Sequence, residues 1–540
     1  MRKTFSIFFL WSFVFSLLSI VPAFANNLQI ANFYDYSTDT SANTMTFTFN
    51  VTQDNSWRNA TNYDAVWMFM KYSTDGGASW NHGSMSASGT NPTGFNAPTG
   101  FEIKVPADEK GFFLQRTDLA AGSISASGVR VVWDYGQDGL SDATAQAGNT
   151  TLKIFGLEMV YIPEGSFYAG DASGGNLTAV LKQGSADEDS WYIASENAIN
   201  ATNASADGYY YFSAGQNDED VDGATFLIPA QFPKGYQAFY LMKYELTEGQ
   251  WVSFFNTLTT DQKTIRDITS STAGGKNSDA VILRNTISWD SASPLKNAKT
   301  TRPDRAVSYI GWPDICAYAD WAALRPYTEL EFEKAARGAG ITAVSGEYAW
   351  GNTTITAAAT FSGTPENGTE TIATASANAN YNNTAFSLGD DYLGVQYTRG
   401  PVRVGIFATS VSTRTTAGTG YYGNMELSGN LWEPTVTVGN SWGRVFLGTH
   451  GDGTLTTLAS YEGNATNLDW PGFNSANPTR GVNGTKGSGY KGGGFETDSF
   501  ERLGTSSRRK VAANAESDAS TSYRSHGGQF FAGRLARTAD

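Results

Sequence analysis

The stretch LRPYTELEFEKAARG, residues 324–338, carries the clearest local signal in the chain. Thr328 and Glu331 have the spacing of a capping box, in which the threonine caps the first helical turn and the glutamate bonds back to the capping residue. Phe332 and the alanines after it follow at helical spacing, and Gly338 favours a helix end. The stretch therefore predicts a short helix that begins after Thr328 and ends at Gly338.

Two further helices are predicted upstream. Residues 247–250, TEGQ, form another capping box, and apolar residues follow at helical spacing, namely Trp251, Phe254, Phe255 and Leu258. Pro313 suits the first position of a second helix, whose apolar face would carry Ile315, Tyr318, Ala319 and Ala322. After Trp350 the chain is rich in glycine and asparagine, with short strands. The predicted fold class is α+β, with few helices and many loops.

The N-terminal part, residues 26–155, has the pattern of an all-β sandwich. Apolar and polar residues alternate over residues 44–51, and we predict similar half-buried strands over residues 66–72 and 129–133. Clusters of Gly, Asn and Asp separate these runs, as in a β-sandwich. Residues 73–80, STDGGASW, match an Asp-box, S-x-D-x-G-x-[ST]-W, which predicts a tight hairpin.

A second part, residues 156–540, begins where the composition changes near Ile154. Within it, residues 172–230 are rich in Asp, Asn, Ser and Ala, which is typical of a polar insertion. The sequence shows no internal repeat over either part. The domain organisation is therefore predicted as a β-sandwich followed by a larger part that contains the three helices.

The first 25 residues have the pattern of a signal peptide. Arg2 and Lys3 form a basic start, residues 5–21 are almost wholly apolar, and residues 23–25, AFA, form an A-x-A cleavage site. A membrane anchor is the alternative, but the small-residue site directly after the apolar run favours cleavage. We expect an exported protein that is periplasmic, cell-surface or secreted, with no membrane span in the mature chain.

Composition narrows the possible partners and the source of stability. The net charge is −15, and loss of Arg2 and Lys3 with the signal peptide would take it to about −17, which disfavours nucleic acid and favours cations. A single cysteine excludes an internal disulfide. Bound calcium is therefore the expected means of tying down the many loops of an acidic exported chain.

Seven motifs occur in order over residues 158–537. They are EMVYIPEGSF at 158–167, FYLMKYELTEGQW at 239–251, the stretch at 324–338, YAWGN at 348–352, SGNLWE at 428–433, KGGGF at 491–495 and GRLAR at 533–537. This series resembles the formylglycine-generating enzyme, or sulfatase-modifying factor, family. The resemblance implies a calcium-binding, C-type-lectin-like α+β fold for residues 156–540, and it does not extend to residues 26–155.

The resemblance also identifies what this chain lacks. Active members of the family oxidise a substrate cysteine with two cysteines that follow the RGGS-like strand, and here those positions fall near Thr497 and Arg502. A hydroxyl and a guanidinium cannot replace the soft sulfur ligands of copper–dithiolate chemistry. Cys316 lies instead on the helix predicted from Pro313, where we expect a buried structural thiol. No catalytic residue is assigned.

A second enzymatic branch of the superfamily holds non-haem iron with histidines. The chain has only His82, His450 and His526, and no H-x-x-x-H pair. A facial triad would need two of them to meet a carboxylate, although they are far apart in the sequence. We therefore expect neither iron nor copper, and interpret His450 and His526 as exposed loop residues.

Two calcium sites are implied by the resemblance. The first would use the carboxylates of Glu426 and Glu433 with the carbonyls of Gly429 and Leu431. The second would use Asn380, the Tyr381 carbonyl, Asp390 and the Tyr392 carbonyl, with Asn378, Asp391 and Leu393 as alternatives in a looser alignment. Solvated turns are the alternative interpretation of both loops.

Two classes of function follow. The first is an exported recognition or surface-binding protein, non-catalytic, that displays loops on a rigid scaffold and binds an extracellular glycan or protein. The second is a metal- and oxygen-dependent oxidase with an atypical site, which rests on analogy of fold alone. The resemblance implies a ligand face surrounded by Trp442, Trp470 and Phe500. These aromatic residues are candidates for stacking on a ligand if they are exposed, whereas Trp432 is expected in the core.

Overall fold

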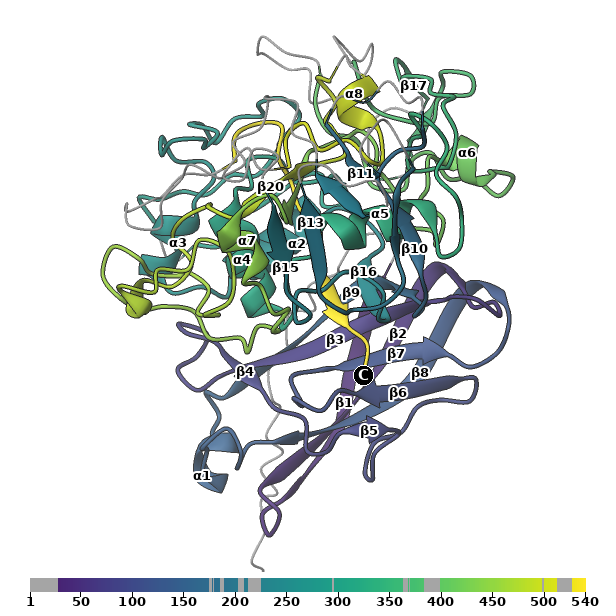
Figure 1. The fold of residues 1–540 in the computed structure, drawn as a ribbon. Helices are drawn as coiled ribbons and strands as arrows, with labels where there is room; N and C mark the ends of the chain where they lie inside the picture. The colour runs from purple at the N-terminus through teal and green to yellow at the C-terminus, as the bar shows by residue number, and fades with distance from the viewer. Residues whose placement is uncertain are drawn as a thin grey trace, which may run out of the picture.

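The computed structural model describes residues 28–173, 177, 179–184, 189–202, 208–211, 225–293, 296–362, 368, 370–382, 399–497, 500–511 and 527–540. The predicted signal peptide, residues 1–25, lies outside them. Figure 1 shows a lower β-sheet part, formed by the N-terminal residues, beneath an upper part that holds most helices and long loops. In the described part of the chain, no helix is long and apolar enough to cross a membrane.

One eight-stranded antiparallel sheet runs through both parts. Its strand order is β21 (Ala536–Thr538), β16 (Phe239–Met242), β9 (Thr151–Ile162), β3 (Asp64–Ser73), β7 (Phe112–Arg116), β6 (Phe101–Val105) and β5 (Gly89–Thr90), and β4 (Asn81–Gly83) also pairs with β3. β9 pairs with β3 over residues 64–73 and with β16 over residues 239–242. The boundary predicted at residue 155 thus falls inside a strand that both parts share.

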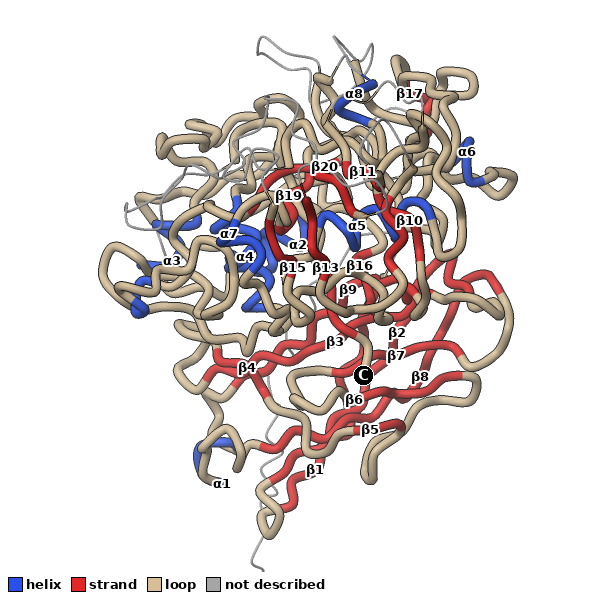
Figure 2. The backbone as a smooth tube through the Cα atoms, in the orientation of Figure 1, coloured by secondary structure: helices blue, strands red, loops and turns tan. Residues whose placement is uncertain are grey.

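The predicted β-sandwich is present. A second sheet, β1 (Gln29–Asp39), β2 (Thr44–Trp57) and β8 (Ala121–Asp134), packs on the N-terminal half of the large sheet (Figure 2). Alternate residues of β2, such as Phe47, Phe49 and Val51, are buried, as the alternation over residues 44–51 predicts. They share one apolar core with Met68 and Trp133.

β3 differs from its prediction, because it is buried on both faces. Val66 and Met68 enter the sandwich core, whereas Trp67 and Phe69 enter the core of the second part. Every residue of the strand is buried, so the prediction of a half-buried strand over residues 66–72 is wrong. The near-continuous apolar run is what a strand covered on both faces requires.

The three predicted helices form with the predicted caps. They are α2 (Glu248–Phe255), capped by Thr247, α4 (Trp312–Trp321), and α5 (Glu329–Arg337), capped by Thr328 and ended by Gly338. Shorter helices are α1 (Asp142–Ala145), α3 (Thr260–Arg266), α6 (Arg414–Ala417), α7 (Ser441–Arg444), α8 (Phe500–Leu503) and a 3₁₀ turn at Pro478–Arg480. The mixture of sheet, few helices and many loops is the predicted α+β class.

The remaining strands are short. β10 (Phe167–Ala169) pairs with β12 (Trp191–Ile193), β17 (Phe361–Ser362) with β18 (Thr371–Ile372), and β19 (Glu433–Val436) with β20 (Ser488–Lys491). A four-stranded sheet has the order β11 (Leu181–Gln183), β14 (Tyr209–Tyr211), β13 (Ile199–Thr202) and β15 (Phe226–Ile228). The described residues of the polar segment 172–230 thus contribute strands of their own.

The Asp-box folds as predicted, in the connection between β3 and β4. The carboxylate of Asp75 accepts hydrogen bonds from the amides of Ala78 and Ser79, both at 3.0 Å, and from the Ser79 hydroxyl. The Trp80 indole donates to the Gly77 carbonyl at 3.2 Å. These contacts make the motif a closed hairpin.

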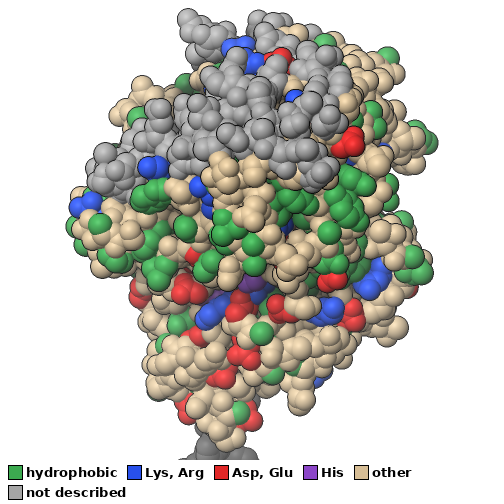
Figure 3. All heavy atoms as spheres, in the orientation of Figure 1, with side chains coloured by type: hydrophobic (Ala, Val, Ile, Leu, Met, Phe, Trp, Pro, Cys, Tyr) green, Lys and Arg blue, Asp and Glu red, His purple; other side chains and the backbone are tan. Residues whose placement is uncertain are grey.

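Polar side chains also join the two parts, in addition to the shared sheet. Arg537, in the last strand, donates two hydrogen bonds of 2.6 Å to Asp108, which precedes β7, and its guanidinium lies 4.2 Å from the centre of the Trp67 ring. Figure 3 shows charged side chains of both signs in a band across the middle of the molecule, at the level of this junction. The N-terminal sandwich is therefore joined to the second part by a shared sheet and by side-chain contacts.

Candidate functional site

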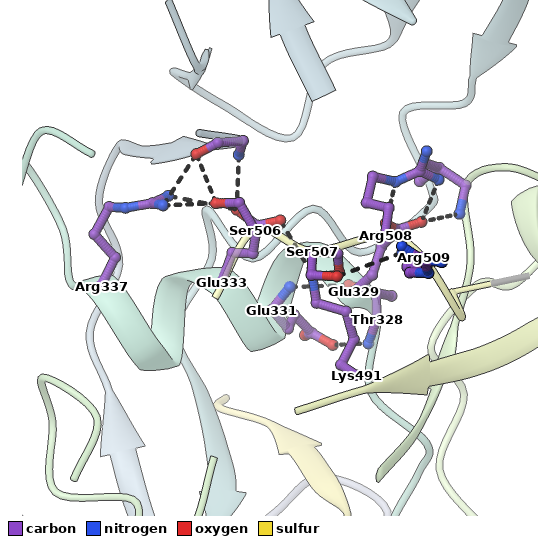
Figure 4. Close-up of polar contacts among 12 residues, drawn as sticks. Thr328, Glu329, Glu331, Glu333, Arg337, Lys491, Ser506, Ser507, Arg508 and Arg509 are labelled. Carbon is purple, nitrogen blue, oxygen red and sulfur yellow. Dashed lines mark hydrogen bonds and ion pairs between the residues drawn. The ribbon is translucent and has the colours of Figure 1, made fainter. Parts of the chain in front are cut away.

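Helix α5, from the stretch 324–338, is held by a network of buried ion pairs. Glu329 pairs with Arg508 at 2.7 Å, and Glu333 pairs with Lys491 at 3.2 Å. Figure 4 shows these side chains reaching from α5 towards β20 and residues 506–509. Glu331 pairs with Arg325 of the same stretch, whereas Glu329 and Glu333 bind distant segments and so fix them to the helix.

Burial and charge act in opposite directions in this network. Burial tends to raise the pKa of Glu329, but the Arg508 guanidinium and its hydrogen bonds outweigh burial and leave the pKa lowered. The amide of Val438 also donates to Glu329, at 2.7 Å. Glu329 therefore stays ionised and structural, and the motif that is most prominent in the sequence is the frame of the site.

The loop over residues 426–433 holds the first predicted calcium site. Glu426, Gly429 and Asn430 all have positive φ, at 57°, 93° and 68°, which folds the chain tightly. Glu245 fixes the loop, because its carboxylate accepts hydrogen bonds from the Leu431 amide at 3.0 Å and from the Asn430 side chain. Burial and the nearby carboxylate of Glu433 raise the pKa of Glu245.

Glu433, a predicted calcium ligand, is occupied by other groups. Its carboxylate accepts hydrogen bonds from Arg534 at 2.5 and 2.7 Å and from the Tyr327 hydroxyl at 2.6 Å. All of these side chains are buried. Since a guanidinium already neutralises both oxygens, the carboxylate of Glu433 does not fit the predicted role in this arrangement.

Glu426, the other predicted carboxylate, does fit a cation. Its Oε1 accepts from the Gly405 amide at 2.8 Å, whereas its buried Oε2 has no hydrogen-bond partner. Burial raises the pKa of Glu426 to about 7. Three buried carboxylates, Glu245, Glu426 and Glu433, act on one another here, and a divalent cation at Oε2 would offset the charge that Arg534 leaves uncompensated.

The two predicted calcium loops lie against each other. The Asn430 amide donates to the Asn380 carbonyl at 2.8 Å, and the Asn380 side chain donates to Asn430 Oδ1 at 2.9 Å. Tyr381 is partly buried beside them. Asp390 and Tyr392, with the alternatives Asp391 and Leu393, lie outside the described residues. Asn378 binds the 354–356 turn instead.

Among the described residues, carboxylates and other ligand side chains do not form a metal centre by themselves. Over the residues that the structure describes, no group of three or more His, Cys, Asp or Glu side chains could hold an ion. An ion beside Glu426 would need backbone carbonyls such as those of Gly429 and Leu431, which belong to the predicted set.

A family model described as "Sulfatase-modifying factor enzyme 1-like domain" matches residues 153–520. The chain belongs to this family. It is 41% identical over 64 residues, 12% of its length, to the formylglycine-generating enzymes of Thermomonospora curvata and Streptomyces coelicolor. The matched residues span about a fifth of these curated relatives, 20% and 19% of their lengths.

Thr497, where the resemblance implies one of the family's cysteine positions, has a buried hydroxyl in this sulfatase-modifying-factor-like chain. Thr497 accepts a hydrogen bond from the Gly494 amide at 2.9 Å, and its carbonyl accepts from Asn382 at 2.8 Å. Arg502 is partly buried in α8. Thr497 thus closes a turn after β20, where thiol chemistry would need an accessible sulfur.

The only cysteine of the chain lies elsewhere. Cys316 is fully buried in α4, within the main apolar core, as predicted. Burial raises the pKa of its thiol well above the usual value. A buried neutral thiol is a poor nucleophile and a poor metal ligand.

Glu496 is a residue of this site that sequence reasoning missed. Its Oε1 accepts from the Trp432 indole at 2.8 Å, and its Oε2 is buried without a partner. Burial raises the pKa of this carboxyl. Its place directly before Thr497 was the available signal. Trp432 itself is in the core, as predicted, at 5% exposure.

The histidines do not form an iron site among the described residues. His450 accepts from the Thr538 amide at 3.0 Å through Nε2, and His82 bonds the Lys110 carbonyl at 2.7 Å. His82 is buried and His450 is partly buried, so the exposure predicted for His450 is wrong, although the residue does lie in a loop. His526 lies outside the described residues.

The aromatic residues predicted as candidates for stacking on a ligand differ in exposure. Trp470 is buried at 1% exposure, and its indole donates to the Thr449 carbonyl, so it is not available for stacking. Trp442 is partly exposed, with Lys486 5.4 Å from its ring centre. The side chain of Phe500 lies outside what the structure describes. Trp442 remains the candidate for a surface contact.

Proposed function

We propose that this protein is an exported, non-catalytic recognition protein, which uses the sulfatase-modifying-factor-like fold as a scaffold. The observation that carries the proposal is the pair formed by Thr497 and Cys316. The threonine hydroxyl closes a turn where the family's active members need a thiol, and the only thiol is buried in α4. An extracellular glycan or protein is the proposed class of ligand.

Calcium is the proposed stabilising ion. The buried and unpartnered oxygen of Glu426 supports a cation at the loop over residues 426–431, with carbonyls of Gly429 and Leu431 as further ligands. Glu433 takes no part in this revised site, because Arg534 holds it. The ion would supply rigidity to the loop and no chemistry. A second ion at Asn380, Tyr381, Asp390 and Tyr392 stays a prediction.

An oxygen-dependent oxidase is the second candidate function. Glu496 is the observation that favours it, because this carboxylate has an unpartnered oxygen next to the position of the family's cysteines. A carboxylate alone is a weak ligand for copper, which prefers nitrogen and sulfur. We therefore rank this function below recognition, and we propose that iron and copper are absent from the exported protein.

The two functions are separated by offering the protein, residues 26–540, a cysteine-containing peptide with copper and oxygen. A formylglycine-generating enzyme serves as the positive control. Recognition predicts that no aldehyde forms, as followed by mass spectrometry and hydrazide labelling. It also predicts that glycan or peptide arrays retain the protein. Conversion of the thiol to an aldehyde, lost in Glu496→Gln, would establish the oxidase instead.

A further inference from the structure

A lysine without a hydrogen-bond partner lies at the junction of the sandwich and the second part. Lys71, in β3, is 0% exposed, and its Nζ makes no hydrogen bond. Its Nζ lies 5.4 Å from the centre of the Trp321 ring and 6.0 Å from that of Phe69. A charged ammonium group in such surroundings loses most of its hydration and gains only weak cation–π contacts.

The strand opposite Lys71 contributes a second unsatisfied nitrogen. His82, in β4, is the direct cross-strand partner of Lys71, and its ring stacks on Phe69. Its Nε2 bonds the Lys110 carbonyl, so that nitrogen carries the proton and Nδ1 keeps a lone pair. Nδ1 is buried and faces Trp321 without a hydrogen bond of normal geometry.

Helix α4 supplies the opposite side of this cluster. Trp321, its last residue, is 3% exposed, and its indole N–H has no partner. Asp320 beside it accepts from the amides of Asp452 at 3.0 Å and Thr466 at 2.8 Å, and so ties α4 to the loop that follows α7. The unpartnered nitrogens of Lys71 and Trp321 thus lie with His82 where β3 and β4 pack on α4.

We propose that Lys71, His82 and Trp321 form a pH-responsive contact between the sandwich and the second part, which holds more tightly when Lys71 is neutral. Titratable groups lie around Lys71 on each neighbouring element. They are His82 on β4, Lys153 opposite it on β9, Lys110 before β7, Asp320 on α4 and Asp452 in the loop after α7. Of these, Asp320 and Asp452 favour the charged lysine and Lys110 opposes it.

The direction of the response follows from burial. Burial lowers the pKa of Lys71 from 10.5 to about 7, and Asp320 and Asp452 only partly oppose this shift. The unfolded chain then binds the proton more tightly than the folded chain between about pH 7 and pH 10. Stability from this group is therefore gained as the pH rises through that window, and it is absent below it.

The test compares the full chain with Lys71→Met and Lys71→Arg by urea unfolding from about pH 6 to about pH 10. The unfolding constant of the wild type, relative to Lys71→Met, should fall by about tenfold per pH unit between pH 7 and pH 10. Lys71→Arg, charged at every pH, should be less stable than the wild type at pH 10. Lys104→Met, in β6, is the matched control and should run parallel to the wild type.

Hydrogen exchange gives a second readout in case Lys71→Arg does not fold. The amides of Asp452, Gly453 and Thr466 report on the contact through their bonds to Asp320. Below pH 7 they should be more protected in Lys71→Met than in the wild type, and equally protected near pH 10. A constant ratio of the unfolding constants of Lys71→Met and wild type across the pH range would overturn the proposal.

Discussion

The ammonium group of Lys243 lies 3.2 Å from the carboxylate of Asp64, with both side chains buried. Lys243 belongs to the family motif at residues 239–251, whereas Asp64 begins β3 in the N-terminal sandwich. Gln53 donates to both Asp64 and Glu158, at 2.9 and 2.8 Å, and so extends the contact to β9. A family signature residue is therefore paired with a segment that the family model does not cover.

Removal of either partner should destabilise the whole chain. Lys243→Met leaves Asp64 and Glu158 buried without their cation, and we expect a loss of about 3–5 kcal/mol in the free energy of unfolding. Urea unfolding, followed by tryptophan fluorescence and circular dichroism, should show a single transition that moves as one. Two separate transitions, of which only one shifts, would contradict a shared structure.

The ion pairs of α5 should differ strongly from exposed ones. Arg508→Met leaves the buried carboxylate of Glu329 without its paired cation, and we expect a loss of about 3–5 kcal/mol in the free energy of unfolding. Lys296→Met is the control, since Lys296 and Asp290 are largely exposed, and it should not change stability measurably. Equal effects of the two variants in denaturant titrations would refute the role of α5 as a frame.

Cys316 should be silent in the folded protein. Its thiol is buried and its pKa is raised, so a thiol reagent should label it only after denaturant is added. Cys316→Ala should cost about 1 kcal/mol and leave any oxidation or ligand binding unchanged. Rapid labelling of the native protein would show that the thiol is accessible and would reopen a catalytic role for it.

Calcium should stabilise the chain through Glu426. Addition of calcium to chelator-treated protein should raise the melting temperature of the wild type, because the ion binds the folded state alone. Glu426→Gln should lose most of this gain, while Glu501→Gln, at a partly exposed pair with Arg509, should keep it. An undiminished response in Glu426→Gln would place the ion elsewhere, for example at the predicted second site.

Local features were predictable from the sequence, and one was overlooked. The caps at Thr247 and Thr328 lie within three residues of the groups that they bond, so the sequence alone defines them. Thr259 and Gln262 form a capping box of the same kind at α3, a helix that we did not predict although its signal is present in the sequence. Short-range hydrogen bonding thus explains why the helices were placed well.

Long-range relationships were not accessible in this way. Arg534 reaches Glu433 across 101 residues, and this pairing depends on a fold that the spacing of the loop does not reveal. The shared sheet was not predictable for the same reason. The pairing of β3 with β9 depends on long-range packing on both faces of β3. Resemblance supplied the loops of the site, and tertiary contacts decide which of their oxygens are available.

Elemental analysis of the mature protein, residues 26–540, purified without chelators, tests most directly the claim that a family scaffold persists here without the family's redox chemistry. We predict one or two calcium ions per chain, with iron and copper near zero. Stoichiometric iron or copper would contradict it, because a redox metal would then be held by residues to which recognition assigns no metal.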